Sequence, residues 1–216
     1  MTNTAPSLVL LFACIFAADT STPKRVIKGD TITSDKSPAI TLKVEKSLKY
    51  VGVFPFKIRD VASGERHVWV EADKKKRVKR LFILQFEGYN EGSGNRYNYS
   101  PRNVTKLGDN EYNSNGFFYS DVQYSKERPG NEAELNRRFL EEKGYRLDEE
   151  QLLYRFYRSL PEDEHRNEFL IFYIEPMADL DIALKDVSAR QDSEREKQLI
   201  AEVRERALKA FTITTY

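Results

Sequence analysis

Cysteine is almost absent from this chain. The single cysteine, Cys14, lies inside an apolar run near the N-terminus. If that run is removed from the mature protein, no thiol remains. A disulfide framework, a cysteine-based zinc site and a thiol nucleophile are then all excluded.

Net charge is lacking as well. The 35 lysines and arginines nearly cancel the 34 aspartates and glutamates, so the chain has no overall field that attracts nucleic acid or an anionic membrane surface. A basic cluster, KKKR at 74–77, stands between two alternating apolar runs and is more simply a solvated hairpin turn than a nucleic-acid patch. We therefore expect no nucleic-acid partner.

The usual signatures of catalysis and metal binding are missing. Neither a G-x-S-x-G nucleophile elbow nor a glycine-rich phosphate loop occurs. The two histidines, His67 and His165, are not spaced as metal ligands with a carboxylate. The sequence predicts no catalytic residue, no metal site and no cofactor, and it favours a protein that is not an enzyme. An enzyme of unrecognised type that uses His67 with Glu71 is the last of three hypotheses.

Residues 1–18 contain no charged side chain, and 8–18 form an unbroken apolar run. As a helix this run would be about 16 Å long, too short to cross a bilayer but suited to the apolar part of a signal peptide. We predict a signal peptide at 1–18 and a secreted or periplasmic protein. The missing Lys or Arg before the run argues against this prediction. A buried N-terminal element and lipid anchoring through Cys14 are the alternatives.

Aromatic residues are unusually numerous. The chain has 13 Phe and 12 Tyr but one Trp, and Phe and Tyr favour the half-buried surface of a sheet. A length of 216 residues suits one domain with a sizeable core. We predict a polar leader at 19–38, in which 24–38 is either leader or a loose first strand, and a single α+β domain at 39–216.

Alternating and apolar runs predict the strands. The hairpin at 151–176 is central, because its second arm, 169–175, is apolar on both faces. Its first arm, 151–160, also fits a helical face, and we favour a strand because its composition is rich in β formers. Pro55 places its strand at an edge or at a bulge. Further strands are expected at 39–47, 49–58, 66–73, 78–89 and 116–124.

Two helices are predicted. Asn131 is a good N-cap for a short helix at 131–143, and an apolar stripe at 193–211 predicts a long C-terminal helix that packs on the sheet. The segment 90–116 is expected to be irregular, with apolar residues too sparse for a core element, and to be either a binding loop or a loose insertion. It carries three tyrosines suited to flat contacts, Tyr97, Tyr99 and Tyr112.

These elements predict an α+β fold with a curved, mainly antiparallel sheet of about seven strands, half-barrel or barrel-like. The outline is similar to lipocalin-like barrels and helix-grip lipid-binding folds by architecture only, because no residue motif links the chain to either. Strands near 81–86 and 169–174 are apolar on both faces, yet one strong amphipathic helix is available to cover them. The other face must be shielded by curvature of the sheet, by the short helix or by the long loop.

A curved sheet around aromatic side chains encloses either a packed interior or a ligand cavity. The leading hypothesis is an exported, non-enzymatic protein that holds an apolar or aromatic small molecule in a sheet-lined pocket. The second is an interaction or structural protein of the envelope or extracellular space without such a ligand. No stable membrane span is expected, and the oligomeric state is not predicted. The candidate pocket residues are Tyr50, His67, Trp69, Tyr119, Arg155 and Tyr173.

Overall fold

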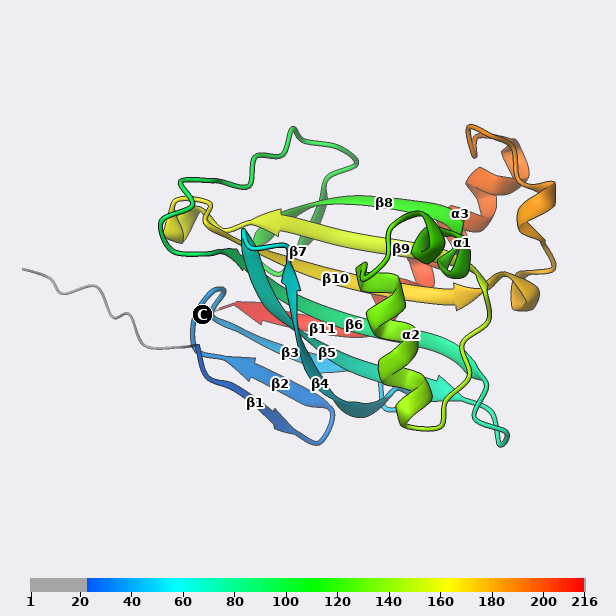
Figure 1. Cartoon of the computed structure of the whole chain (residues 1–216), viewed down its shortest axis with the longest axis horizontal. Coiled ribbons are helices and arrows are strands. Elements are labelled where there is room, and N and C mark those ends of the chain that lie inside the picture. The colour runs from blue at the N-terminus through cyan, green and yellow to red at the C-terminus, as the bar shows by residue number, and fades with distance from the viewer. Residues whose placement is uncertain (1–22, 216) are drawn as a thin grey trace, which may run out of the picture.

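The structure is a computed structural model that describes residues 23–215. The predictions for the N-terminal run, including the signal peptide and Cys14, lie outside this range. Within it the chain forms two antiparallel sheets and three α-helices (Figure 1), which confirms the predicted α+β class. No helix in the described range is long and apolar enough to cross a membrane.

The larger sheet has seven strands in the order β4-β5-β6-β10-β9-β8-β7. Within the described range its edge strands β4 and β7 do not pair with each other, so the sheet is open and the barrel-like part of the prediction is not confirmed. Pro55 lies in an edge strand, as predicted, where a missing N–H leaves the ladder intact. The strands are β4 (Lys49–Ile58), β5 (Ala62–Ala72), β6 (Val78–Tyr89), β10 (Asn167–Pro176), β9 (Glu150–Ser159), β8 (Asn110–Ser120) and β7 (Thr105–Leu107).

The central strands β6 and β10 are buried on both faces. Phe86 lies opposite Phe169, and Phe82 lies opposite Tyr173, and all four are at most 3% exposed. The alternate residues of both strands belong to a second apolar cluster on the other face. Strand β9 pairs with β10 along its length, which confirms the strand predicted for 151–160 and excludes the helical alternative.

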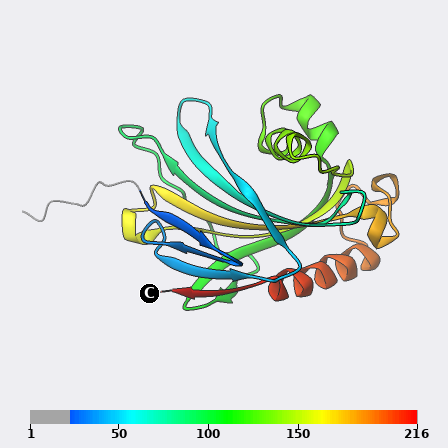
Figure 2. The ribbon, with the colours of Figure 1, turned by 90° about the horizontal axis from the view of Figure 1, so that it is seen from below.

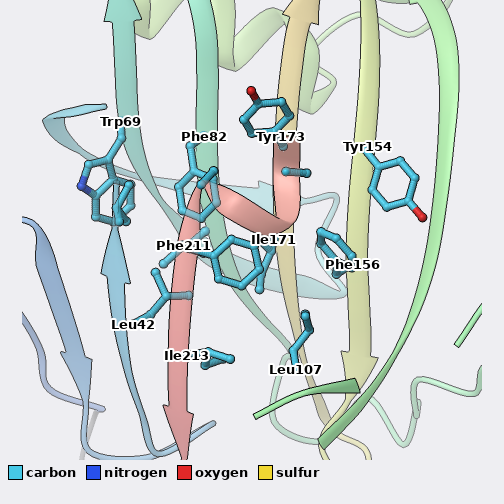
Figure 3. Close-up of a cluster of buried hydrophobic side chains, with 14 of the residues drawn as sticks. Leu42, Trp69, Phe82, Leu107, Tyr154, Phe156, Ile171, Tyr173, Phe211 and Ile213 are labelled. Carbon is cyan, nitrogen blue, oxygen red and sulfur yellow. The ribbon is translucent and has the colours of Figure 1, made fainter. Parts of the chain in front are cut away.

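The smaller sheet covers one face of the larger sheet, together with helix α3 (Glu194–Lys209) (Figure 2). Its order is β1-β2-β3-β11. The side chains of both sheets meet in the main core, where Leu42, Phe82, Phe156 and Phe211 lie together (Figure 3). The strands are β1 (Arg25–Lys28), β2 (Thr31–Ser34), β3 (Ile40–Val44) and β11 (Phe211–Thr215).

Two segments of the smaller sheet differ from the sequence-based expectation. The segment predicted as a polar leader or a loose first strand contains two paired strands, β1 and β2, and Ile32 of β2 is completely buried. The C-terminal helix ends at Lys209 rather than at Phe211, because the β-branched run that follows pairs with β3.

Helices α1 (Asp121–Glu127) and α2 (Glu132–Glu142) lie on the opposite face of the larger sheet (Figure 2). Helix α2 confirms the predicted short helix, since Asn131 Oδ1 accepts hydrogen bonds from the amides of Ala133 (2.6 Å) and Glu134 (3.1 Å). The strand predicted at 116–124 is wrong at its end. Ser120 caps helix α1 instead, and its hydroxyl accepts a hydrogen bond from the Gln123 amide at 3.1 Å.

The irregular segment is shorter than the predicted 90–116. Strands β7 and β8 form a hairpin that begins at Thr105, and Tyr112 is completely buried. The expectation that this stretch contributes nothing to the core is therefore wrong, and the irregular part is 90–104. The described range also contains the 3₁₀ turns η1 (Pro161–Asp163), η2 (Met177–Leu180) and η3 (Leu184–Asp186).

Candidate functional site

A pocket of about 500 Å³ lies between the larger sheet and the helices α1 and α2. Six neighbouring strands, from β4 to β8 in the sheet order, supply its floor. Side chains two residues apart on a strand point to the same face. Its apolar and aromatic lining consists of Ile58, Phe117, Tyr119, Tyr124, Ala133, Leu153, Tyr157, Leu170, Phe172 and Ile174. Its charged, amide and remaining phenol groups are Arg66, Gln85, Glu87, Tyr99, Glu132, Asn136, Arg155 and Glu168.

Two buried glutamates face each other in this pocket. Glu87 of β6 and Glu168 of β10 are direct partners in the antiparallel ladder, which places their Cβ atoms about 4.5–5.5 Å apart. They are 6% and 5% exposed. Burial raises the pKa of both carboxyls, and the charge of Glu87 raises the pKa of Glu168 further, to about 8. Near neutral pH the pair therefore holds at least one proton.

Two tyrosines from the segment 90–104 reach these carboxyls. The Tyr97 hydroxyl donates to Glu87 Oε1 at 2.7 Å, and the Tyr99 hydroxyl donates to Glu168. Burial raises the pKa of both phenols well above the ordinary value, so the hydroxyls stay protonated and act as donors. Tyr97 also stacks on Tyr89 of β6, with 4.3 Å between the ring centroids. Tyr97 and Tyr99, two residues apart, therefore attach the irregular segment to the pocket.

Arg66 of β5 is a buried cation in the same pocket, 4% exposed. Its Nε donates to Gln85 Oε1 at 2.6 Å, and its Nη1 donates to Asn136 Oδ1 at 2.9 Å and to the Glu132 carbonyl at 3.1 Å. Burial lowers the pKa of Arg66 to about 10, which leaves the guanidinium charged at neutral pH. The Gln85 side chain also donates to Glu87 Oε2 at 2.6 Å. One amide side chain therefore stands between the cation and the carboxylate pair.

Arg155 of β9 is the second cation of the pocket. Its Nε donates to Asn115 Oδ1 at 2.8 Å. The guanidinium lies over the rings of Tyr157 and Phe117, with 4.9 Å and 5.7 Å from its carbon to the two centroids. Cation–π contacts of this kind hold a cation in place without neutralising it.

The structure separates the six candidate pocket residues into two groups. Tyr119 and Arg155 line the pocket. Tyr50, His67, Trp69 and Tyr173 lie on the opposite face of the sheet, at or beside the main core. His67 Nδ1 lies 3.2 Å from the Tyr50 hydroxyl, and His67 Nε2 lies 3.1 Å from Glu65 Oε1. The partner that the enzyme hypothesis gave to His67, Glu71, instead binds Arg80.

Sequence reasoning missed the polar residues of the pocket, chiefly Arg66, Gln85, Glu87 and Glu168. A signal for them exists in β6. Leu81 and Ile83 are apolar on the pocket face, and Gln85 and Glu87 continue that face with polar groups. Strand β6 is otherwise apolar and buried on both faces. Two polar residues, Gln85 and Glu87, at one end of its pocket face therefore indicate that this end does not belong to a dry core.

Among the described residues, no group of three or more His, Cys, Asp or Glu is placed to hold a metal ion. The polar chemistry of the pocket is that of two guanidinium groups, three carboxyls, two side-chain amides and the phenols. Comparisons of the chain with protein-family models, with curated proteins and with solved structures found no match.

Proposed function

We propose that the protein binds an apolar or aromatic small molecule in the pocket beneath helices α1 and α2. The observation that carries this proposal is the pocket itself. Its volume of about 500 Å³ falls within the range of roughly 300–1,000 Å³ that is usual for ligand sites. Eleven of its eighteen lining residues are apolar or aromatic, and a predominantly apolar and aromatic lining is usual for such sites.

The lining favours binding over acyl transfer. The described residues around the pocket include no Ser, Thr, Cys or His, the side chains from which nucleophile and base pairs are usually built. The Tyr97 and Tyr99 hydroxyls are already engaged with the two carboxyls. The groups on the pocket floor therefore hold one another in place, as a preformed binding site requires.

The proposal includes export, as predicted from the apolar run at 8–18. The mass of the mature protein from its native source tests this part. We expect a mass that lacks about the first 18 residues. A mass equal to the full 216-residue chain would overturn export and leave the binding proposal untouched.

Fluorescence of Nile red, a neutral apolar dye, tests binding. We expect saturable enhancement with the wild-type protein and loss of enhancement in Leu170→Trp, because Leu170 lines the pocket and a larger side chain fills it. Leu153→Phe is the milder variant if the first one does not fold. Val53→Trp adds the same indole on the edge strand, where Val53 is 46% exposed, and should leave binding unchanged. Dye binding that is absent, or that survives both filling variants, would refute the pocket as the site.

A further inference from the structure

The pocket contains a buried charge with no counter-charge in contact. Arg66 is 4% exposed, yet the acceptors of its hydrogen bonds are two side-chain amide oxygens and one main-chain carbonyl. Within the described residues no carboxylate lies within 4.0 Å of its guanidinium. The carboxylates of Glu132 and Glu87 act on this charge only through space. A buried cation with no carboxylate in contact is costly. Such a group in a pocket wall points to an anion that arrives with a ligand.

Arg66 also has donor capacity left. Its Nη2 makes no hydrogen bond within the part of the chain that the structure describes, and this nitrogen is not completely buried. Arg66 belongs to the pocket lining, and its guanidinium carbon lies 5.3 Å from the ring centroids of Phe56 and Phe172. These rings hold the guanidinium without competing for its hydrogens.

Arg155 adds a second positive charge to the pocket. Its Nε is bound to Asn115, and neither of its terminal nitrogens has a hydrogen bond or an ion pair in the described range. Arg66 therefore has one free terminal nitrogen and Arg155 has two, and both arginines line the pocket. Of the three carboxyls in the lining, Glu87 and Glu168 already accept hydrogen bonds from Tyr97, Tyr99 and Gln85, and the Glu132 carboxylate has no hydrogen bond in the described range. The unused donor capacity of the site therefore lies on its two arginines.

We infer that the ligand is an apolar molecule with a carboxylate head group, which binds Arg66 in the field of Arg155 while its body lies along the aromatic wall. This inference rests on the proposed function and specifies its ligand class. Arginine suits a carboxylate because its planar fork matches the two oxygens. A positively charged ammonium head group would instead be repelled by the two arginines.

The carboxyl pair makes this binding sensitive to pH. Glu168 is faced by Glu87 from β6, Arg155 from β9, Tyr99 from the segment 90–104 and Glu132 from α2. Because its pKa is raised to about 8, Glu168 is protonated near neutral pH and does not repel an anion. Above that pH it becomes negative, and a bound carboxylate is repelled.

Displacement of Nile red by three molecules with one twelve-carbon chain tests the inference. Dodecanoate, dodecylamine and dodecanol differ only in the head group. We expect dodecanoate to compete at a concentration about tenfold or more below that of dodecanol, as a charge-assisted hydrogen bond implies, and dodecylamine to be the weakest. Between pH 7 and pH 9.5 the affinity for dodecanoate should fall, and that for dodecanol should stay constant.

Variants assign the effect to the arginines. Arg66→Gln should weaken dodecanoate about tenfold and leave dodecanol within about threefold, and Arg155→Gln gives a second reading if Arg66→Gln does not fold. Arg158→Gln is the matched control, because Arg158 lies on the same strand but over Tyr112 on the opposite face. Equal competition by the acid and the alcohol, stronger competition by the amine, or no effect of either pocket variant would overturn the carboxylate inference. In those cases dye binding still supports the pocket, whereas absence of dye binding defeats the proposed function itself.

Discussion

Replacing Glu168 by Gln should make the folded protein more stable at alkaline pH and leave it nearly unchanged at acidic pH. Glu168 is 5% exposed and faces Glu87 across the ladder. Glutamine has the same shape, and its amide oxygen can accept the hydrogen bond that the Tyr99 hydroxyl donates to Glu168. The substitution therefore removes the ability to ionise and little else.

The size of the effect follows from the pKa. In the folded protein it is raised from 4.5 to about 8, so between these values the folded state keeps a proton that the unfolded state has lost. Stability of the wild type must then fall as pH rises from about 4.5 to about 8, and it levels off above that. At about 1.36 kcal/mol for each pKa unit, the loss is on the order of 5 kcal/mol.

Urea denaturation at pH 5, 7 and 9 measures this loss. The only tryptophan, Trp69, is completely buried in the main core and reports global unfolding. We expect Glu168→Gln to match the wild type at pH 5 and to exceed its free energy of unfolding by several kcal/mol at pH 9. Glu111→Gln, at an exposed position on β8, should show no such trend. A difference between Glu168→Gln and wild type that does not change with pH would falsify the raised pKa.

Three further predictions concern the main core and the start of helix α3, each measured as the free energy of unfolding in urea. Gly116→Ala should cost about 1–3 kcal/mol by overpacking, because a Cβ there would lie 2.8 Å from Ile200 Cγ2 of α3, and Ile200→Ala should recover part of the loss. Phe211→Ala should cost about 3–4 kcal/mol, since its ring lies 5.5 Å from that of Phe82, whereas Thr212→Ala on the same strand should cost far less. Ser193→Ala should cost about 1 kcal/mol by removing the N-cap of α3, and Ser193→Asp should retain most of that stability.

The centre of the fold could be predicted because its signals are strong and local. The second arm of the hairpin, 169–175, is apolar at consecutive positions, and such a run of strand length is typical of a sheet covered on both faces. Its position between β6 and β9 follows that expectation. Asn131 likewise signalled the start of α2 through its capping side chain.

The smaller sheet was harder to predict because its evidence is not local. Strand β2 has four residues, and Ile32 is the only large apolar side chain among them. Its burial depends on pairing with β3 and on packing against the larger sheet. Phe211 fits the apolar stripe of α3 as well as it fits β11, and only pairing with Val44 decides between them. Tertiary contacts therefore determine these boundaries.

Aromatic content alone does not tell which face of the larger sheet carries the pocket. In a sheet buried on both faces, a residue and its neighbour point to different layers, and both layers are apolar. Trp69 and Tyr173 are on the face that packs against the smaller sheet, where large rings fill space completely. The rings of the other face, such as Tyr119 and Phe172, share it with Arg66 and Glu168. Because burying unpaired charges in a dry core is costly, a charged residue on an otherwise apolar strand face is better evidence for a cavity than an aromatic residue is.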